Sequence, residues 1–315
     1  EVKPGLYQGK VVVEAGREAE TLTLPLTFKL YDLQFPAWPS IAVGGWDYVN
    51  GRGSYEASLP GLPALIKSLT EHFVDTPWAT SSVAPQNPKF DPEGKVVAAN
   101  FDNWDEWVGK WPGARRYAVF LSMSDGFQGE ALGSPGFNAK VGGWITAWVE
   151  HLKTQDLKPE QLVLLIYDEP HSQAGVDIIV PWARAIKAAQ PKVTIFEDPT
   201  FQNPAEADPA LYEVCDILCP NLPMALSGGK SFRDFYQGWR AKGKTLWYYS
   251  CSGPGKLLDP IYYHRSQFWH ALRDGAEGSF YWAFGDEAGA SSFQPYRQTR
   301  TGYSPLFLTP EGVVD

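Results

Sequence analysis

One stretch decides the fold of this 315-residue chain: Leu162-Val163-Leu164-Leu165-Ile166-Tyr167-Asp168-Glu169-Pro170. Its five consecutive aliphatic residues predict a strand buried on both faces, as in parallel sheets. Pro170 has no N–H for a sheet hydrogen bond, so the strand should end there and leave Asp168 and Glu169 at its C-terminal end. In parallel α/β folds this end carries the chemistry. Two carboxylates at that position suggest acid/base catalysis on a glycosidic bond.

Seven further segments predict strands, at 41–48, 78–83, 117–123, 193–197, 217–219, 245–249 and 279–284. Helical patterns fall between most of them, at 62–73, 141–152, 176–189, 232–241 and 262–273. Eight strands alternating with helices over about 250 residues predict an α/β fold, a (β/α)8 TIM-like barrel. A doubly wound open sheet is the alternative, but no Gly-rich phosphate-binding fingerprint follows an early strand. A long loop is expected over 84–111, and a loop of that length is typically functional.

The first 35 residues differ from the rest. Residues 10–14 and 21–31 alternate like the two arms of a β-hairpin around a polar turn at 15–18. An isolated hairpin is marginal in water, so we expect it to pack on the main body or to be the end of an upstream β-sandwich. Pro36 and Pro39 mark the boundary, which predicts a hairpin segment over 1–35 and a catalytic barrel over 36–315.

Composition restricts the partners. The formal net charge is −9 and Lys and Arg do not cluster, so nucleic acid is not an expected partner. No apolar run approaches the roughly 20 residues that span a bilayer. The sequence begins without a signal peptide, and polymeric sugars as substrates would place the protein in a secreted, periplasmic or cell-surface location. Three cysteines form neither a disulfide framework nor a zinc spacing, and we expect no catalytic metal or other cofactor.

Aromatic side chains are abundant, with 13 Trp and 15 Tyr, and several fall near predicted strand ends. Flat amphipathic rings stack on the apolar faces of sugars, although core packing is the alternative for each ring. With nearby polar groups, the residues expected to contact a glycan are Trp46, Tyr48, Tyr167, His171, Asn221, Trp247, Tyr249, Trp282 and Asp286.

The seventh predicted strand ends Trp247-Tyr248-Tyr249-Ser250-Cys251, without an acid. Retaining barrel hydrolases commonly take a glutamate nucleophile from a late strand, so a retaining mechanism here would need a nucleophile from the substrate, a 2-acetamido group. Glu169 would then be the acid/base, and Asp168 would accept the acetamido N–H while Tyr249 bonds the carbonyl.

Other carboxylates leave alternatives open. Glu197-Asp198-Pro199 resembles the first acidic pair in form and ranks second to it. An inverting mechanism would pair Glu169 with Glu197 or Asp286 across about 6.5–9.5 Å. A barrel glycosidase acting on a non-acetamido polysaccharide and a carbohydrate-binding barrel without catalysis are the further alternatives.

Four motifs in this order resemble the catalytic domain of glycoside hydrolase family 123. They are Tyr167-Asp168-Glu169-Pro170, Leu246-Trp247-Tyr248-Tyr249-Ser250-Cys251 followed by Pro254, His264-Arg265-Ser266-Gln267-Phe268-Trp269, and Gly278-Ser279-Phe280-Tyr281-Trp282. The resemblance covers most of residues 36–315. It implies a β-N-acetylgalactosaminidase barrel with a substrate-assisted mechanism, in which Asp168 orients the acetamide and Glu169 is the acid/base. It also implies that the hairpin ends a preceding β-sandwich.

Overall fold

The computed structural model describes residues 2–15, 20–34, 36, 38–48, 62–251, 261–283, 307–309 and 312–314. The chain divides into two units, Glu1–Pro39 and Ser40–Asp315. In the first, strand β1 (Gly5–Ala15) pairs antiparallel with β2 (Glu20–Leu30), which confirms the predicted hairpin. Cross-strand pairs such as Tyr7 with Phe28 and Val11 with Leu24 give it one apolar face, and these four side chains are exposed.

The second unit is built on a closed barrel of eight parallel strands, which confirms the predicted (β/α)8 fold. Each strand lies at or within a few residues of a segment predicted from the apolar runs. The strand formed by Leu162–Leu165 pairs in parallel with the neighbours on both sides, at Leu164 with Val119 and with Ile195. In barrel order the strands are β3 (Ala42–Tyr48), β4 (Thr76–Thr80), β7 (Tyr117–Phe120), β10 (Leu162–Leu165), β11 (Thr194–Glu197), β12 (Ile217–Leu218), β13 (Thr245–Ser250) and β14 (Gly278–Tyr281).

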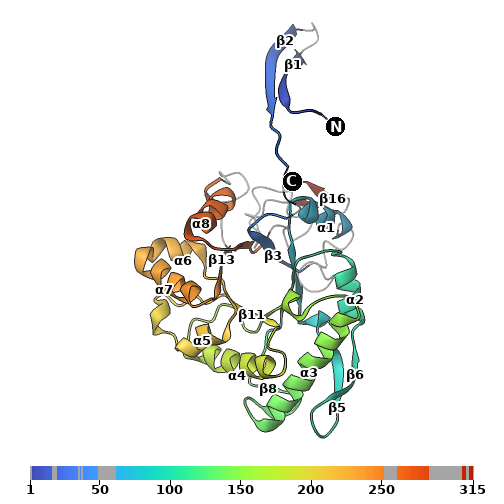
Figure 1. Ribbon diagram of the computed structural model, residues 1–315, viewed down its shortest axis with the longest axis vertical. Helices are drawn as coiled ribbons and strands as arrows, with labels where there is room; N and C mark the ends of the chain where they lie inside the picture. Colours follow the sequence, from blue (N-terminus) through green and yellow to red (C-terminus); the bar gives the residue numbers. More distant parts are fainter. Residues whose placement is uncertain are drawn as a thin grey trace. The chain divides into compact units, whose positions relative to one another are not determined.

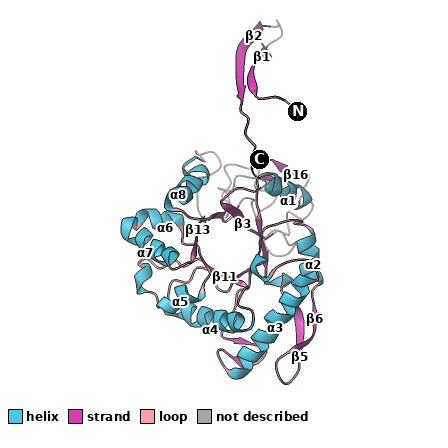
Figure 2. Ribbon diagram, viewed as in Figure 1, coloured by secondary structure: helices cyan, strands magenta, loops and turns pink. Residues whose placement is uncertain are grey.

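Helices surround the barrel, which Figures 1 and 2 show from one end. Several begin at a side chain that accepts a backbone N–H of the first turn, as Ser134 does from Phe137 and Asp208 from Ala210. The helices are α1 (Leu62–Glu71), α3 (Pro135–Lys153), α4 (Gln173–Ala189), α5 (Pro209–Val214), α6 (Leu222–Ser227), α7 (Gly229–Ala241) and α8 (Ser266–Asp274).

The segment expected as a long loop is folded. It contains a two-stranded ribbon, β5 (Gln86–Phe90) with β6 (Val96–Asn100), and helix α2 (Asp102–Gly109). Trp104 and Trp107 of α2 are buried, and Asp105 of the same helix contacts His151 at 2.6 Å and Gln155 at 2.7 Å, so both core packing and polar contacts hold α2. Short elements complete the fold: β8 (Gly126–Phe127), β9 (Glu130–Ala131), β15 (Phe307–Thr309), β16 (Gly312–Val314), the 3₁₀ turns Ser81–Val83, Pro159–Gln161 and Pro204–Glu206, and the π-helical turn Ile261–Arg265.

Aromatic rings fill the barrel interior. Trp247 stacks on Phe280 with ring centroids 4.5 Å apart, and Trp46 stacks on Trp78 at 4.7 Å. A Cβ atom at position 278 would lie 2.4 Å from the Trp247 ring, so Gly278 provides the space this ring occupies. The interior is therefore a packed core beneath the C-terminal ends of the strands, as in other barrels of this kind.

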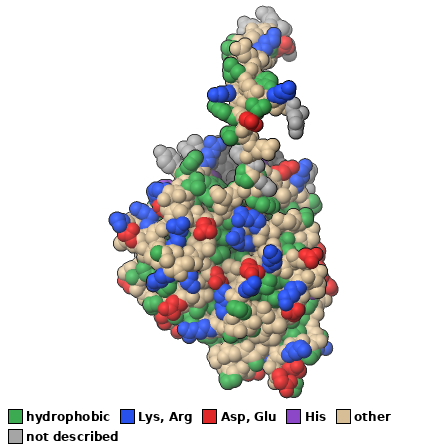
Figure 3. Space-filling view, in the orientation of Figure 1, with side chains coloured by type: hydrophobic (Ala, Val, Ile, Leu, Met, Phe, Trp, Pro, Cys, Tyr) green, Lys and Arg blue, Asp and Glu red, His purple; other side chains and the backbone are tan. Residues whose placement is uncertain are grey.

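Charges of both signs are mixed over the face seen in Figure 3, without a basic patch. Within the described residues, no helix has the length and apolar character needed to cross a membrane.

Candidate active site

A pocket of about 280 Å³ lies at the C-terminal ends of the barrel strands. The residues that line it lie at or just beyond the ends of five strands, β3, β10, β11, β13 and β14. The lining side chains are Trp46, Asp168, Glu169, Asp198, Tyr249, Cys251 and Trp282. Carboxylates and aromatic rings thus share one hollow, at the end of the barrel where catalytic groups of this fold are found.

The two adjacent carboxylates face the same pocket because the backbone leaves the extended conformation at Glu169. On a regular strand Asp168 and Glu169 would point to opposite faces. Glu169 instead has a φ of 47°, in the left-handed region that residues with a Cβ rarely occupy. The turn directly after β10 therefore directs both side chains to the pocket.

Glu169 is held by contacts to its side chain and its backbone. The Tyr249 hydroxyl donates a hydrogen bond to Oε1 of Glu169, and the Cys251 thiol lies 3.9 Å from the same oxygen. The Glu169 N–H donates to Oδ1 of Asp198 at 3.0 Å. A carboxyl group fixed in this way is suited to transfer a proton at a defined position.

Asp168 is exposed to the pocket, yet protein atoms replace much of the water around its carboxyl group. This desolvation, together with the charge of Glu169, raises the pKa of Asp168 to about 6, and a hydrogen bond with Asp198 opposes the shift. Asp168 is therefore mostly ionised at neutral pH and able to accept hydrogen bonds from a ligand.

The second acidic pair, Glu197 and Asp198, is buried, with 0% and 1% of its surface exposed. Burial, and then the charge of nearby carboxylates, raises the pKa of each well above its usual range. The two side chains lie differently: Asp198 lines the pocket, whereas Glu197 accepts the Ile166 N–H at 3.0 Å and is not among the lining residues. Glu197 thus ties β11 to the end of β10.

Neither a family model nor a curated protein matches the sequence. Among solved structures, a family 123 glycoside hydrolase from Clostridium perfringens superposes with a TM-score of 0.64 at 14% identity, over 90% of this chain and 56% of that one. An endo-1,4-β-D-mannanase from Thermotoga petrophila gives 0.52 at 11% identity over 86% and 96%, and an endo-β1,6-glucanase gives 0.52 at 9% identity over 88% and 74%. The fold is that of glycoside hydrolase barrels. The chain spans little more than half the length of the family 123 enzyme.

Three of the aromatic residues expected to meet a glycan line the pocket of this barrel. Trp46 and Tyr249 lie side by side, with ring centroids 5.4 Å apart, and Trp282 completes the set. Trp247 does not join them, which corrects our expectation of a substrate contact. Its side chain is fully buried in the barrel core against Phe280, so it offers no surface to a ligand.

Three other predicted residues border the site without lining the pocket. Tyr167 is half-buried and packs against the core between barrel and helices. His171 is exposed, and its Nδ1 lies 3.0 Å from the backbone oxygen of Glu169. Asn221 is buried at the start of α6, where its Oδ1 accepts the Met224 N–H, and its Nδ2 contacts the Cys251 sulfur at 3.7 Å. These residues support the site from outside.

Two predictions lie outside the described residues, the side chain of Tyr48 and the whole of Asp286. Two lining residues were not predicted to contact substrate, Asp198 and Cys251. Asp198 had a signal, since it follows a buried strand and precedes a proline as Glu169 does. For Cys251 the only signal in the sequence was its position at the end of the seventh predicted strand, β13.

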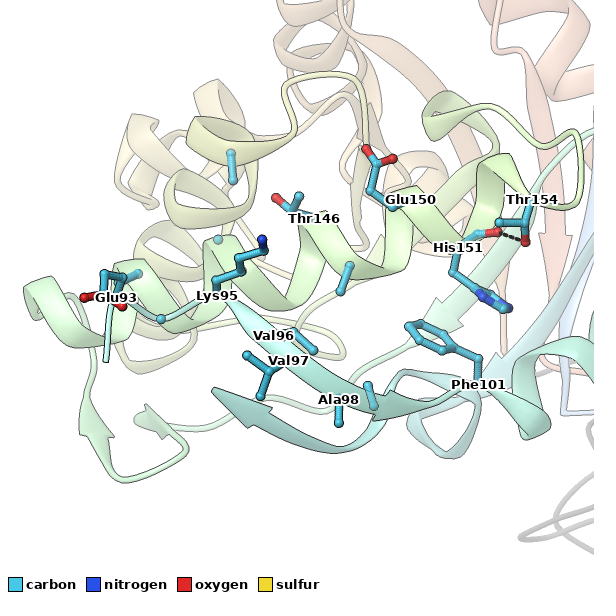
Figure 4. A pocket seen from close by; sticks show the side chains of 17 residues that line it. Glu93, Lys95, Val96, Val97, Ala98, Phe101, Thr146, Glu150, His151 and Thr154 are labelled. Carbon is cyan, nitrogen blue, oxygen red and sulfur yellow. Dashed lines mark hydrogen bonds between the residues drawn. The ribbon is translucent and has the colours of Figure 1, made fainter. Parts of the chain in front are cut away.

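A larger hollow of about 800 Å³ lies between β6 and α3, away from the strand ends (Figure 4). Its wall is made mostly of small side chains, and its two acids, Glu93 and Glu150, are exposed. Phe101 at one end stacks on His151 with centroids 4.0 Å apart, so that ring already has a protein partner. This hollow lacks the buried acid groups of the barrel pocket.

Proposed function

We propose that this protein is a retaining glycoside hydrolase that removes terminal β-N-acetylhexosamine residues, with β-N-acetylgalactosaminides as the favoured substrates. One observation carries the proposal: Asp168 and Glu169, adjacent in sequence, face a single pocket with aromatic walls at the catalytic end of the barrel. The four motifs of the sequence and the similarity in fold to a family 123 enzyme that hydrolyses glycolipid glycans support the choice of substrate.

In this mechanism the acetamido carbonyl oxygen of the substrate attacks the anomeric carbon as the bond to the leaving oxygen breaks. Glu169 donates its proton to that oxygen, which leaves as an alcohol. Asp168, ionised at neutral pH, accepts the acetamido N–H and stabilises the positive charge of the oxazolinium intermediate. Glu169 then takes a proton from the water that opens the ring, and the configuration at the anomeric carbon is retained.

Asp198, the third carboxyl group of the pocket, is poorly suited to be a protein nucleophile. Its side chain is 1% exposed, one oxygen accepts the Glu169 N–H, and burial raises its pKa well above the usual range. A protonated, hydrogen-bonded carboxyl group is a weak nucleophile. This supports a nucleophile carried by the substrate.

The test is hydrolysis of the aryl β-glycosides of N-acetylgalactosamine, N-acetylglucosamine and galactose. Wild type is expected to cleave only acetamido sugars, fastest for N-acetylgalactosamine, with retention of configuration and inhibition by a thiazoline analogue. Glu169→Gln is expected to lose at least about 100-fold in kcat on substrates with poor leaving groups, the usual size of a general acid/base contribution.

Glu150→Gln, an exposed carboxyl group on α3 outside the pocket, is the matched control and should retain activity. Turnover of the galactoside at a comparable rate would refute substrate assistance. Binding of acetamido sugars without turnover would instead indicate a carbohydrate-binding barrel.

A further inference from the structure

The left-handed conformation of Glu169 needs support from its surroundings, because a residue with a Cβ does not adopt it by preference. That support comes from the segment after β11. Asp198 Oδ1 accepts the Glu169 N–H at 3.0 Å, and Thr200 Oγ1 donates to the Glu169 backbone oxygen at 3.2 Å. The Thr200 N–H also donates to the backbone oxygen of Pro170 at 3.0 Å. Both peptide groups of Glu169 are therefore fixed by one neighbouring segment.

The second carboxyl oxygen of Asp198, Oδ2, has different surroundings. Oδ2 is buried and receives no hydrogen bond from an N–H or O–H donor of the described residues. The side chains of Asp198 and Asp168 line the same pocket, and a hydrogen bond between their carboxyl groups lowers the pKa of Asp168. Two carboxyl groups in such contact hold a proton between them, because two negative charges at this distance repel strongly.

The surroundings of Asp198 decide which group keeps the proton. Its carboxyl neighbours are Asp168, Glu169 and Glu197, while Asp168 is open to the pocket. The other ionisable groups near it are the Tyr249 hydroxyl and the thiols of Cys219 and Cys251, none of which carries a positive charge. A fully buried carboxyl group among other carboxyl groups is uncharged. Burial raises the pKa of Asp198, whose surface is 1% exposed, so the proton stays on this buried group and not on the open Asp168.

We propose that Asp198 is a positioning residue: as an uncharged acid it accepts the Glu169 N–H with one oxygen and donates its proton to Asp168 from the other. One side chain thereby fixes the backbone of the acid/base and orients the group that holds the acetamide. This role rests on the proposed function, in which Glu169 and Asp168 act on the substrate. Asp198 acts only through those two residues.

Two substitutions separate this role from a charged one. In Asp198→Asn the amide keeps an oxygen for the Glu169 N–H and an N–H for Asp168, so kcat should fall by less than about fivefold. In Asp198→Ala both hydrogen bonds are lost, and kcat should fall on the order of 100-fold, as expected when a catalytic group is displaced by about 1 Å. Equal, large losses in both folded variants would overturn the proposal, because they would show that the carboxylate itself is required. Full activity in Asp198→Ala would overturn it as well.

Thr200→Val tests the same segment without changing a carboxyl group, since it removes only the donor to the Glu169 oxygen. We expect a loss of activity between those of the two Asp198 variants. Asp208→Ala is the matched control, because this exposed Asp also accepts a backbone N–H, that of Ala210, far from the pocket. It should lower stability slightly and leave kcat unchanged.

A readout that does not depend on any substrate distinguishes failure of this inference from failure of the proposed function. Exchange of the Glu169 amide hydrogen with solvent, measured by NMR, should be slow in wild type and in Asp198→Asn and at least about tenfold faster in Asp198→Ala, since a lost hydrogen bond opens the amide to water. Slow exchange in Asp198→Ala would refute the positioning role even if the enzyme cleaves acetamido sugars. The predicted pattern in a protein without glycosidase activity would leave the positioning role intact and refute the proposed reaction.

Discussion

The hydroxyl of Tyr249 donates a hydrogen bond to Oε1 of Glu169, which joins the end of β13 to the turn after β10. The sequence had suggested a different partner for this hydroxyl, the acetamido carbonyl of a substrate. In the structure this hydroxyl instead orients the proposed acid/base. Burial, with the hydrogen bond to Glu169 and the charge of that group, raises the pKa of Tyr249, so the phenol keeps its proton and remains a donor.

Tyr249→Phe should therefore lower kcat by about 10- to 100-fold. This loss corresponds to a hydrogen bond to a charged group, which contributes roughly 1.5–3 kcal/mol. Steady-state kinetics with the aryl N-acetylgalactosaminide measure the loss. Tyr248→Phe is the matched control, because Tyr248 is on the same strand but its hydroxyl contacts Asp274 at 3.2 Å outside the pocket. Equal losses in both variants would show that the effect is structural.

The acid side of the pH profile should report Asp168. Its pKa is raised to about 6, so the carboxylate needed to accept the acetamido N–H is present above this pH and is lost as the pH falls below it. We expect kcat/KM to fall with a one-proton dependence below about pH 6. A profile that stays flat to pH 4.5 would contradict this assignment.

The Glu169→Gln variant extends the same prediction to binding. The charge of Glu169 contributes to the raised pKa of Asp168, so its removal should lower that pKa. Binding of a thiazoline inhibitor to Glu169→Gln, followed by calorimetry across pH, should therefore persist to lower pH than in wild type.

Glu197 should affect stability and not catalysis. Its folded-state pKa is raised well above its usual value, so its protonated form stabilises the fold at low pH, and this contribution is lost as the pH rises from its unfolded pKa toward the folded one. Glu197→Gln keeps an oxygen for the Ile166 N–H and cannot ionise. Its Tm should decrease less with pH than that of wild type, while its activity stays within a few-fold. A loss of kcat as large as that of Glu169→Gln would restore the two-carboxylate alternative.

Thiol chemistry offers a probe of the pocket. Cys215 and Cys219 are buried, whereas Cys251 is half-exposed and lines the pocket. Burial and the charge of Glu169 raise the pKa of Cys251 to about 11. Alkylation by iodoacetamide should be slow at pH 7 and rise about tenfold per pH unit, because only the thiolate reacts. Activity should fall in step with modification of this one cysteine, and the thiazoline should protect it; Cys251→Ala should resist the reagent.

The barrel could be predicted because its strands are buried on both faces and therefore appear as short apolar runs. The ribbon β5–β6 escaped prediction because none of its strand residues is buried, so its strands contain no run of core residues to mark them. Strand alternation placed Trp247 and Tyr249 on the same interior face, but it contains no information on depth, and Trp247 lies one layer below the pocket.

The backbone at Glu169 could not be predicted either. Left-handed residues are usually signalled by glycine or asparagine, and here a glutamate adopts the conformation because residues just after β11 hold it. The contacts of Asp198 with the Glu169 N–H and with the Asp168 carboxyl group depend on that turn, so a strand-end acid ranked second in the sequence is a pocket residue in the fold.

At the position of Glu169, the residue that would be best for stability differs from the residue that the proposed reaction needs. A left-handed residue with a Cβ costs about 1–2 kcal/mol, a noticeable part of the 5–15 kcal/mol that separates folded from unfolded chains. Glycine and asparagine accept this backbone more readily. Directed evolution of this barrel for heat resistance alone would tend to remove its proposed acid/base, whereas selection on turnover would keep the glutamate and seek compensating substitutions elsewhere.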